Sequence, residues 1–161
     1  MTPRVAVLGA GNMAGAMVGT LRRGGFDVTV WNRTPERAET VASAHGATIA
    51  SSSSEAVAAA DVVLSSLADD EAVLATYLGE NGAASACGPE QVVLEMSTIA
   101  PESARRVGEA VAATGAAFLD APVSGSVPTV EEGELTIMVG ATRARGSGPA
   151  EVCREHGFVV G

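Results

Sequence analysis

A short stretch near the N-terminus decides the fold: Val5-Ala6-Val7-Leu8-Gly9-Ala10-Gly11-Asn12-Met13-Ala14. Residues 5–8 are aliphatic and rich in valine, which predicts a buried strand. Two glycines then break the strand. Residues 12–23 place Met13, Met17 and Leu21 four residues apart, which predicts a helix with one apolar face. The chain is therefore expected to run from a strand through a tight turn into a helix.

This turn has the form G-x-G-x-x-A. In that context Gly9 permits the tight turn, Gly11 lets a pyrophosphate approach the backbone, and Ala14 keeps the helix close to the sheet. Asn12 and Met13 begin the helix, whose first N–H groups attract phosphates. The turn predicts a dinucleotide-binding site, and the alternative is a glycine-rich turn without a ligand.

The alternation of strand and helix continues along the chain. The end of the second strand is followed by Thr34, a predicted helix cap, and a run of four serines ends at Ser54, a second predicted cap. Residues 79–90 are predicted to form a loop. Further strands are predicted at residues 28–31, 47–49, 62–64, 92–94, 117–120 and 135–139, and helices at 34–45, 55–60, 69–78 and 101–114.

Strands that alternate with helices of this length predict an α/β fold, a Rossmann-type, doubly wound and mostly parallel sheet. We expect one cofactor-binding domain over residues 3–140. Residues 141–161 lack an amphipathic period, and we expect them to form an atypical, poorly ordered tail.

Composition excludes several classes of function. The chain of 161 residues has a net charge of −9, and its ten basic residues are all arginine, which argues against binding nucleic acid. No apolar run reaches the roughly 18 residues of a membrane helix. Cys87 and Cys153 form no CxxC pair and no metal-binding spacing, so we expect two free thiols, no metal and a cytoplasmic location.

The residues that end the second predicted strand distinguish between two cofactors. An NAD-binding domain usually has a carboxylate there for the ribose 2′-hydroxyl, but this chain has Asn32-Arg33-Thr34. A guanidinium binds a 2′-phosphate well, and Asn32 and Thr34 add neutral hydrogen-bonding groups. The segment favours NADP(H) over NAD(H), and the alternative for Arg33 is an ordinary surface arginine.

Four motifs in order resemble the β-hydroxyacid dehydrogenases, the group of 3-hydroxyisobutyrate dehydrogenase and the glyoxylate/succinic semialdehyde reductases, related to 6-phosphogluconate dehydrogenase. The motifs are VLGAGNMAGAM at 7–17, WNRTP at 31–35, MSTIAP at 96–101, and DAPVSG at 120–125 followed by GELTIMVG at 133–140. The resemblance implies hydride transfer between NADP(H) and a small hydroxy acid or aldehyde acid.

The resemblance also implies roles for individual residues. Ser124 and Gly125 would hold the substrate carboxylate, because a hydroxyl and a loop N–H both donate to an anion. Thr98 would contact the nicotinamide ring or its ribose. Leu67 and Ala68 would line the cofactor after the fourth strand.

The chain departs from the family pattern in two ways. Ser126 stands where the family usually has glycine, and Pro128-Thr129 stand where it commonly has Gly-Ala, which alters the substrate loop if a positive φ is required there. The family continues beyond residue 140 into a helical domain with a catalytic lysine, whereas this chain contains no lysine. Arginine cannot replace it, because arginine stays protonated.

From this we expect a truncated enzyme that lacks the second, helical domain and binds NADP(H) but turns over slowly or not at all. Its uncovered apolar surface is expected to cause self-association or to receive a lysine-bearing partner chain. Two alternatives remain: a non-catalytic NADP-binding module or subunit, and an imine-reductase-like enzyme. The loop at 120–125 argues against the latter, because it suits a carboxylate substrate.

Overall fold

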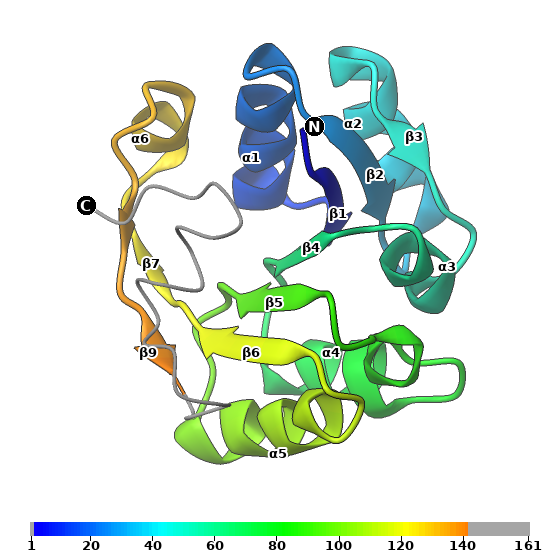
Figure 1. The fold of residues 1–161 in the computed structure, drawn as a ribbon. Helices are drawn as coiled ribbons and strands as arrows, with labels where there is room; N and C mark the ends of the chain where they lie inside the picture. The colour runs from blue at the N-terminus through cyan, green and yellow to red at the C-terminus, as the bar shows by residue number, and fades with distance from the viewer. Residues whose placement is uncertain (1, 142–161) are drawn as a thin grey trace.

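The computed structural model describes residues 2–141. In this part of the chain a central sheet has seven strands (Figure 1), which follow one another across the sheet in the order β3 (Thr48–Ile49), β2 (Asp27–Trp31), β1 (Arg4–Leu8), β4 (Val62–Ser65), β5 (Val92–Glu95), β6 (Ala117–Asp120) and β9 (Gly140–Ala141). All neighbouring pairs are parallel except β6 and β9. The strand order reverses at β1, and the predicted Rossmann-type sheet is confirmed.

The helices cover both faces of this sheet. One face packs against α1 (Asn12–Arg23), α2 (Pro35–His45) and α6 (Val127–Glu131), and the other against α3 (Ser53–Ala58), α4 (Asp70–Leu78), α5 (Pro101–Ala112) and the 3₁₀ helix η1 (Ala83–Ala86). Among the described residues, no helix has the length and apolar character needed to cross a bilayer. The arrangement is doubly wound, as the alternating pattern predicts.

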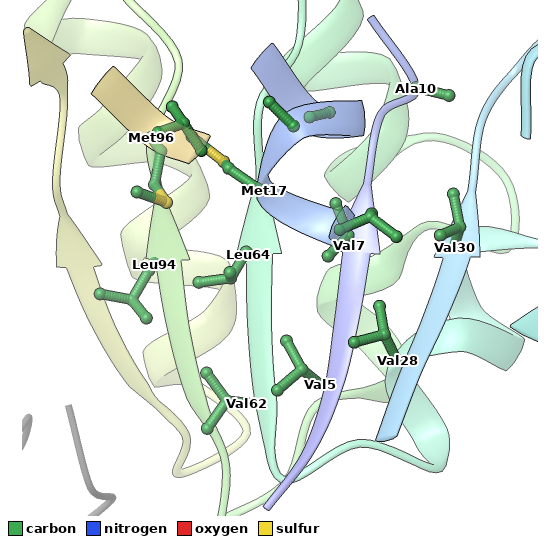
Figure 2. Close-up of a cluster of buried hydrophobic side chains, with 14 of the residues drawn as sticks. Val5, Val7, Ala10, Met17, Val28, Val30, Val62, Leu64, Leu94 and Met96 are labelled. Carbon is green, nitrogen blue, oxygen red and sulfur yellow. The ribbon is translucent and has the colours of Figure 1, made fainter. Parts of the chain in front are cut away.

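Alternate residues of each strand supply the two cores. In β1, Val5 and Val7 face α1, whereas Ala6 and Leu8 face the opposite layer. Figure 2 shows the first face, where the valines of neighbouring strands lie beneath Met17 of α1. Small and aliphatic side chains build these layers, which agrees with the low aromatic content of 3%.

The predicted strand over residues 135–139 is wrong in its extent. Only β8 (Thr136–Ile137) forms there, and it pairs with β7 (Val123–Ser124) in a separate antiparallel sheet. The N–H of Met138 bonds to the carbonyl of Pro122, and Gly140 then pairs with Asp120 of β6. The predicted strand is shortened because residues 136–137 pair with β7, whereas the pairing with β6 begins only at Gly140.

Three local predictions also need correction. Thr34 occupies the N-cap position of α2, but its side chain makes no capping hydrogen bond. Ser52, not Ser54, caps α3 by accepting from the N–H of Glu55 at 3.1 Å. The carboxylate of Glu55 accepts in return from the N–H of Ser51, the residue before the cap. An acidic residue three positions after a serine is typical of a helix that begins at that serine, here Ser52. Helix η1 lies inside the predicted loop at 79–90.

Candidate functional site

A cleft of about 550 Å³ opens at the carboxyl ends of β1, β2 and β4. Open α/β sheets bind ligands at this place, where the strand order reverses. The cleft is lined by nine of the residues predicted to contact the cofactor, namely Gly9, Gly11, Asn12, Met13, Asn32, Arg33, Thr34, Leu67 and Ala68. The sequence missed other lining residues, among them Trp31, Arg37, Ser66 and Glu80.

The glycine loop after β1 needs its first glycine for two reasons. Gly9 has a φ of +119°, which L residues rarely adopt. A Cβ at this position would also lie 2.2 Å from the carbonyl oxygen of Ser66. The N–H of Gly9 donates to the carbonyl of Trp31 at 2.8 Å. The loop is therefore held between the ends of β2 and β4, and only glycine fits.

Gly11 has a different environment. A Cβ placed on it would meet no atom of residues 2–141 within 4 Å apart from its own chain neighbours, so the space beside it is open. Gly11 is also the N-cap of α1, and in the part of the chain that the structure describes no side chain caps this helix or places an acidic group in its first turn. The first N–H groups of α1 thus have no side-chain acceptor and face the cleft, an arrangement that suits an anion.

Asn32 connects the end of β2 to the glycine loop. Its Oδ1 accepts from the N–H of Ala10 at 3.1 Å, and its Nδ2 donates to the carbonyl of Thr34 at 3.0 Å. The sequence assigned Asn32 a neutral hydrogen bond to the cofactor. The structure shows that its acceptor and one of its donors are used within the protein, so Asn32 shapes the cleft wall as well as lining it.

Two guanidinium groups lie at this end of the cleft. Arg33 and Arg37 are both exposed and line it, and within residues 2–141 neither side chain forms an ion pair or a hydrogen bond. Arg37 follows Arg33 by four residues across the start of α2, a spacing that could have revealed it. The carboxylate in the lining, Glu80, comes after α4 and not at the end of β2.

Thr98 is the predicted cofactor residue that the structure does not bring into the lining. It is exposed beyond the end of β5. Its neighbour Ser97 is buried, and Ser97 Oγ accepts from the N–H of Leu67 at 2.8 Å. The segment that contains Thr98 therefore supports a wall of the cleft, although Thr98 itself lies outside it.

The predicted substrate residues lie apart from the cofactor cleft. Ser124 ends β7 and Gly125 follows it, and both are exposed. Gly125 has a φ of +154°, and a Cβ there would lie 2.9 Å from Leu135 Cδ1. Ser126, in contrast, has an extended backbone and precedes α6, so its departure from glycine causes no strain.

The helix after this loop is anchored on the cofactor domain. The hydroxyl of Thr20 on α1 donates to the carbonyl of Val130 on α6 at 3.0 Å, and the guanidinium of Arg23 donates to the carbonyl of Glu131 at 3.2 Å. The N–H of Ser126 donates to Thr129 Oγ1 at 3.2 Å and closes the first turn of α6. The loop around Ser124 is thus fixed at one end by α1.

Two observations concern the cysteines and the metal-ligating side chains of the described residues. Cys87 is a buried free thiol, and burial raises its pKa to about 11, so little thiolate forms at neutral pH. Cys153 lies outside the described residues. In the part of the chain that the structure describes, no cluster of three or more His, Cys, Asp or Glu side chains is placed to hold a metal ion.

Comparison with known proteins agrees with this geometry. Residues 4–154 match the family described as the NAD binding domain of 6-phosphogluconate dehydrogenase. The 3-hydroxyisobutyrate dehydrogenase of Pseudomonas aeruginosa is 39% identical over 147 residues, which cover 91% of this chain and 47% of that protein. The chain therefore spans about half the length of the curated relatives it matches.

Solved structures give the same result. The 3-hydroxyisobutyrate dehydrogenase of Mycobacterium tuberculosis, described with L-serine, aligns with a TM-score of 0.81 and 34% identity, over 96% of this chain and 50% of that one. A protein described as Psf3 in complex with NADP+ and 2-OPP aligns with a TM-score of 0.82 and 30% identity, over 94% of this chain and 52% of that one.

Proposed function

This chain belongs to the family of the NAD binding domain of 6-phosphogluconate dehydrogenase, and we propose that it binds NADP(H) in the cleft at β1, β2 and β4. The cofactor-binding domain comprises residues 3–140. It is the nucleotide-binding part of an oxidoreductase that acts on small β-hydroxy acids or aldehyde acids. The similarity to 3-hydroxyisobutyrate dehydrogenases supports this substrate class.

The observation that carries the choice of NADP(H) is the guanidinium of Arg33 at the end of β2, which has no ion-pair or hydrogen-bond partner among residues 2–141. A 2′-phosphate carries negative charge, and arginine binds phosphate oxygens through two parallel hydrogen bonds. Arg37 adds a second positive charge at the same end. The amide of Asn32 occupies the position where a carboxylate would repel the phosphate.

Two further features of the cleft support the proposed cofactor. The open space beside Gly11 leaves room for the pyrophosphate, and the uncapped N-terminus of α1 supplies N–H donors. When bound, the nicotinamide would accept or supply the hydride. The protein's own contribution is to hold the 2′-phosphate and the pyrophosphate and to align the nicotinamide half beside β4 and β5.

The test is a titration of NADPH and NADH against the wild-type chain and Arg33→Ala. We expect the variant to bind NADPH roughly tenfold more weakly while NADH affinity stays unchanged. Arg106→Ala is the matched control, because Arg106 is exposed on α5 and does not line the cleft. An unchanged preference for NADPH in Arg33→Ala would refute the assignment.

For the substrate, we propose that Ser124 Oγ and the N–H of Gly125 hold its carboxylate. Both residues are exposed on the loop that α1 fixes through α6. Ser124→Ala should raise the KM for a hydroxy acid and leave NADPH affinity unchanged. The KM is measured in an enzyme in which this chain is joined to a lysine-bearing helical domain. Equal KM values in both forms would reject the role.

The chain contains no lysine to move the alcohol proton, so we propose that the 161-residue chain alone turns over slowly or not at all. This absence also favours a second candidate, a nucleotide-binding subunit that works with a lysine-bearing chain. Steady NADP+ reduction by the isolated chain, at a rate typical of dehydrogenases, would disprove both.

A surface for such a partner, or for a second copy, lies near the substrate loop. Ile137 and Met138 expose 39% and 51% of their area, large fractions for apolar side chains. We propose that this surface causes self-association of the isolated chain. Sedimentation velocity over a range of concentrations measures it, and a monomer at every concentration would contradict it.

A further inference from the structure

A chain of buried polar groups lies beneath the carboxyl ends of β4 and β5. Glu95 ends β5 and has an exposed fraction of 0%. Ser65 Oγ donates to Glu95 Oε2 at 2.5 Å, and Tyr77 Oη lies 2.6 Å from Ser65 Oγ. Since the hydroxyl hydrogen of Ser65 is given to the carboxylate, Tyr77 donates to Ser65. The carboxylate thus connects β5, β4 and α4.

The other carboxylate oxygen leads to the cleft. The N–H of Ser97 donates to Glu95 Oε1 at 2.8 Å, and Ser97 Oγ accepts from the N–H of Leu67 at 2.8 Å. Leu67 and Ala68 line the cleft, and the adjacent carbonyl of Ser66 bounds the position of Gly9. The position of Leu67 and Ala68 in the cleft wall therefore depends on Ser97, and Glu95 holds Ser97 by accepting from its N–H.

This arrangement has an energetic cost. Burial raises the pKa of Glu95, the hydrogen bonds from Ser65 and Ser97 partly offset that rise, and the nearby carboxylate of Asp120 adds to it. Tyr77, the titratable group on the α4 side, has a pKa raised well above its ordinary value, mainly by burial. An apolar side chain would avoid this cost, so the network supplies geometry rather than stability.

The place of the network in the sheet relates it to one half of the cofactor. In the proposed binding mode the 2′-phosphate lies at β2 and the pyrophosphate at β1, and the nicotinamide half would then extend towards β4 and β5, the next strands of the sheet. We propose that Glu95 is a positioning residue, which acts through Ser97 to hold Leu67 and Ala68 against the nicotinamide half of the bound cofactor. The proposal rests on the NADP-binding function proposed above.

Two ligands separate the halves of the cleft. NADPH spans both, whereas adenosine 2′,5′-bisphosphate lacks the nicotinamide half: its 2′-phosphate reaches the arginine end and its 5′-phosphate reaches the glycine loop. Ser97→Ala leaves the N–H of Leu67 without its acceptor, and we expect it to bind NADPH about tenfold more weakly. Its affinity for the bisphosphate should stay within about twofold of the wild-type value. Isothermal titration calorimetry measures both ligands, and thermal unfolding reports stability.

Glu95→Gln is the second variant. Glutamine has one acceptor oxygen and one NH2 group, so it can accept from Ser65 Oγ or from the N–H of Ser97 but not on both sides, and we expect the same selective loss of NADPH affinity. Ser103→Ala is the matched control, because Ser103 is equally buried, on α5, and bonds to Asp70 outside the cleft. It should change neither affinity.

The outcomes separate the two proposals. Wild-type affinity for NADPH in Ser97→Ala, or an equal loss of both ligands, overturns the positioning role. A wild-type chain that binds neither ligand overturns the proposed function and this inference with it. If Glu95→Gln does not fold, Ser97→Ala alone decides, because it removes only one hydroxyl.

Discussion

The N–H of Ala10 donates to Asn32 Oδ1 at 3.1 Å, and this bond joins the glycine loop to the end of β2. The loop is the proposed phosphate-binding turn, and the end of β2 is the place where dinucleotide-binding domains distinguish NADP(H) from NAD(H). The hydrogen bond between Ala10 and Asn32 therefore couples the position of the glycine loop to the position of the residues at the end of β2. A substitution at Asn32 tests whether shape and selectivity can be separated.

Asn32→Asp should weaken the preference for NADPH over NADH by roughly tenfold. A carboxylate still accepts from the N–H of Ala10, so the loop keeps its position, but the new charge repels a 2′-phosphate. Fluorescence titration of the two cofactors measures the ratio. Asn32→Ala is the control: it removes the acceptor and should weaken both cofactors together. Unchanged selectivity in Asn32→Asp would argue against a 2′-phosphate at this end of the cleft.

Gly9→Ala should lower the stability of the fold by about 1–3 kcal/mol. Its φ of +119° is unfavourable for alanine, and the new Cβ would lie 2.2 Å from the carbonyl oxygen of Ser66. Urea unfolding monitored by circular dichroism measures the loss.

Gly11→Ala should behave in the opposite way. Apart from its chain neighbours, a Cβ there meets no atom of the described residues within 4 Å, and the backbone φ of −75° suits alanine, so stability should stay within about 0.5 kcal/mol. NADPH affinity should still fall, because the methyl group enters the space left for the pyrophosphate. Full NADPH affinity in Gly11→Ala would place the pyrophosphate elsewhere.

The stability of the chain should depend on pH through Glu95. Its pKa in the folded state is raised above the ordinary value of 4.5. At a pH between these two pKa values, the folded state therefore retains a proton that the unfolded state has lost. The stabilisation is complete below pH 4.5 and is lost as pH rises through the folded pKa. The free energy of unfolding of the wild type should therefore fall relative to that of Glu95→Gln over this rise.

Urea unfolding of both proteins at a series of pH values measures this difference. Exposed carboxylates such as Glu55, whose pKa is lowered chiefly by the hydroxyl of Ser51, give opposite trends, but they contribute equally to both proteins and cancel. A constant difference from acidic to neutral pH would mean that Glu95 titrates normally.

Cys87 should react slowly with thiol reagents while the chain is folded. It is 8% exposed, and its pKa of about 11 leaves little thiolate at pH 8. In a Cys153→Ser background, an aromatic disulfide reagent measures the remaining thiol. Rapid reaction of the folded protein would indicate that η1 opens readily; the same reaction in urea gives the reference rate.

The sequence predicted most of the sheet, because valine-rich strands and capped helices are local signals. The failures have different causes. Residues 135–139 look like one strand, but only Thr136–Ile137 pairs there, with β7, and the pairing with β6 begins at Gly140, outside the predicted range. The acidic residue Glu55 could have shown that Ser52, not Ser54, begins α3, since the S-x-x-E spacing is a capping signal.

The sequence by itself determined the strand, the glycine turn and the helix of the phosphate-binding loop, and it placed Arg33 at the end of β2. These features depend on neighbours within a few residues. Only the tertiary structure decided that the Ser66 carbonyl bounds Gly9, that Glu80 and Arg37 share a cleft with it, and that Glu95 reaches Leu67 through Ser97. Those contacts join residues far apart in the chain, and they exist because the parallel strand order brings the ends of β1, β4 and β5 together.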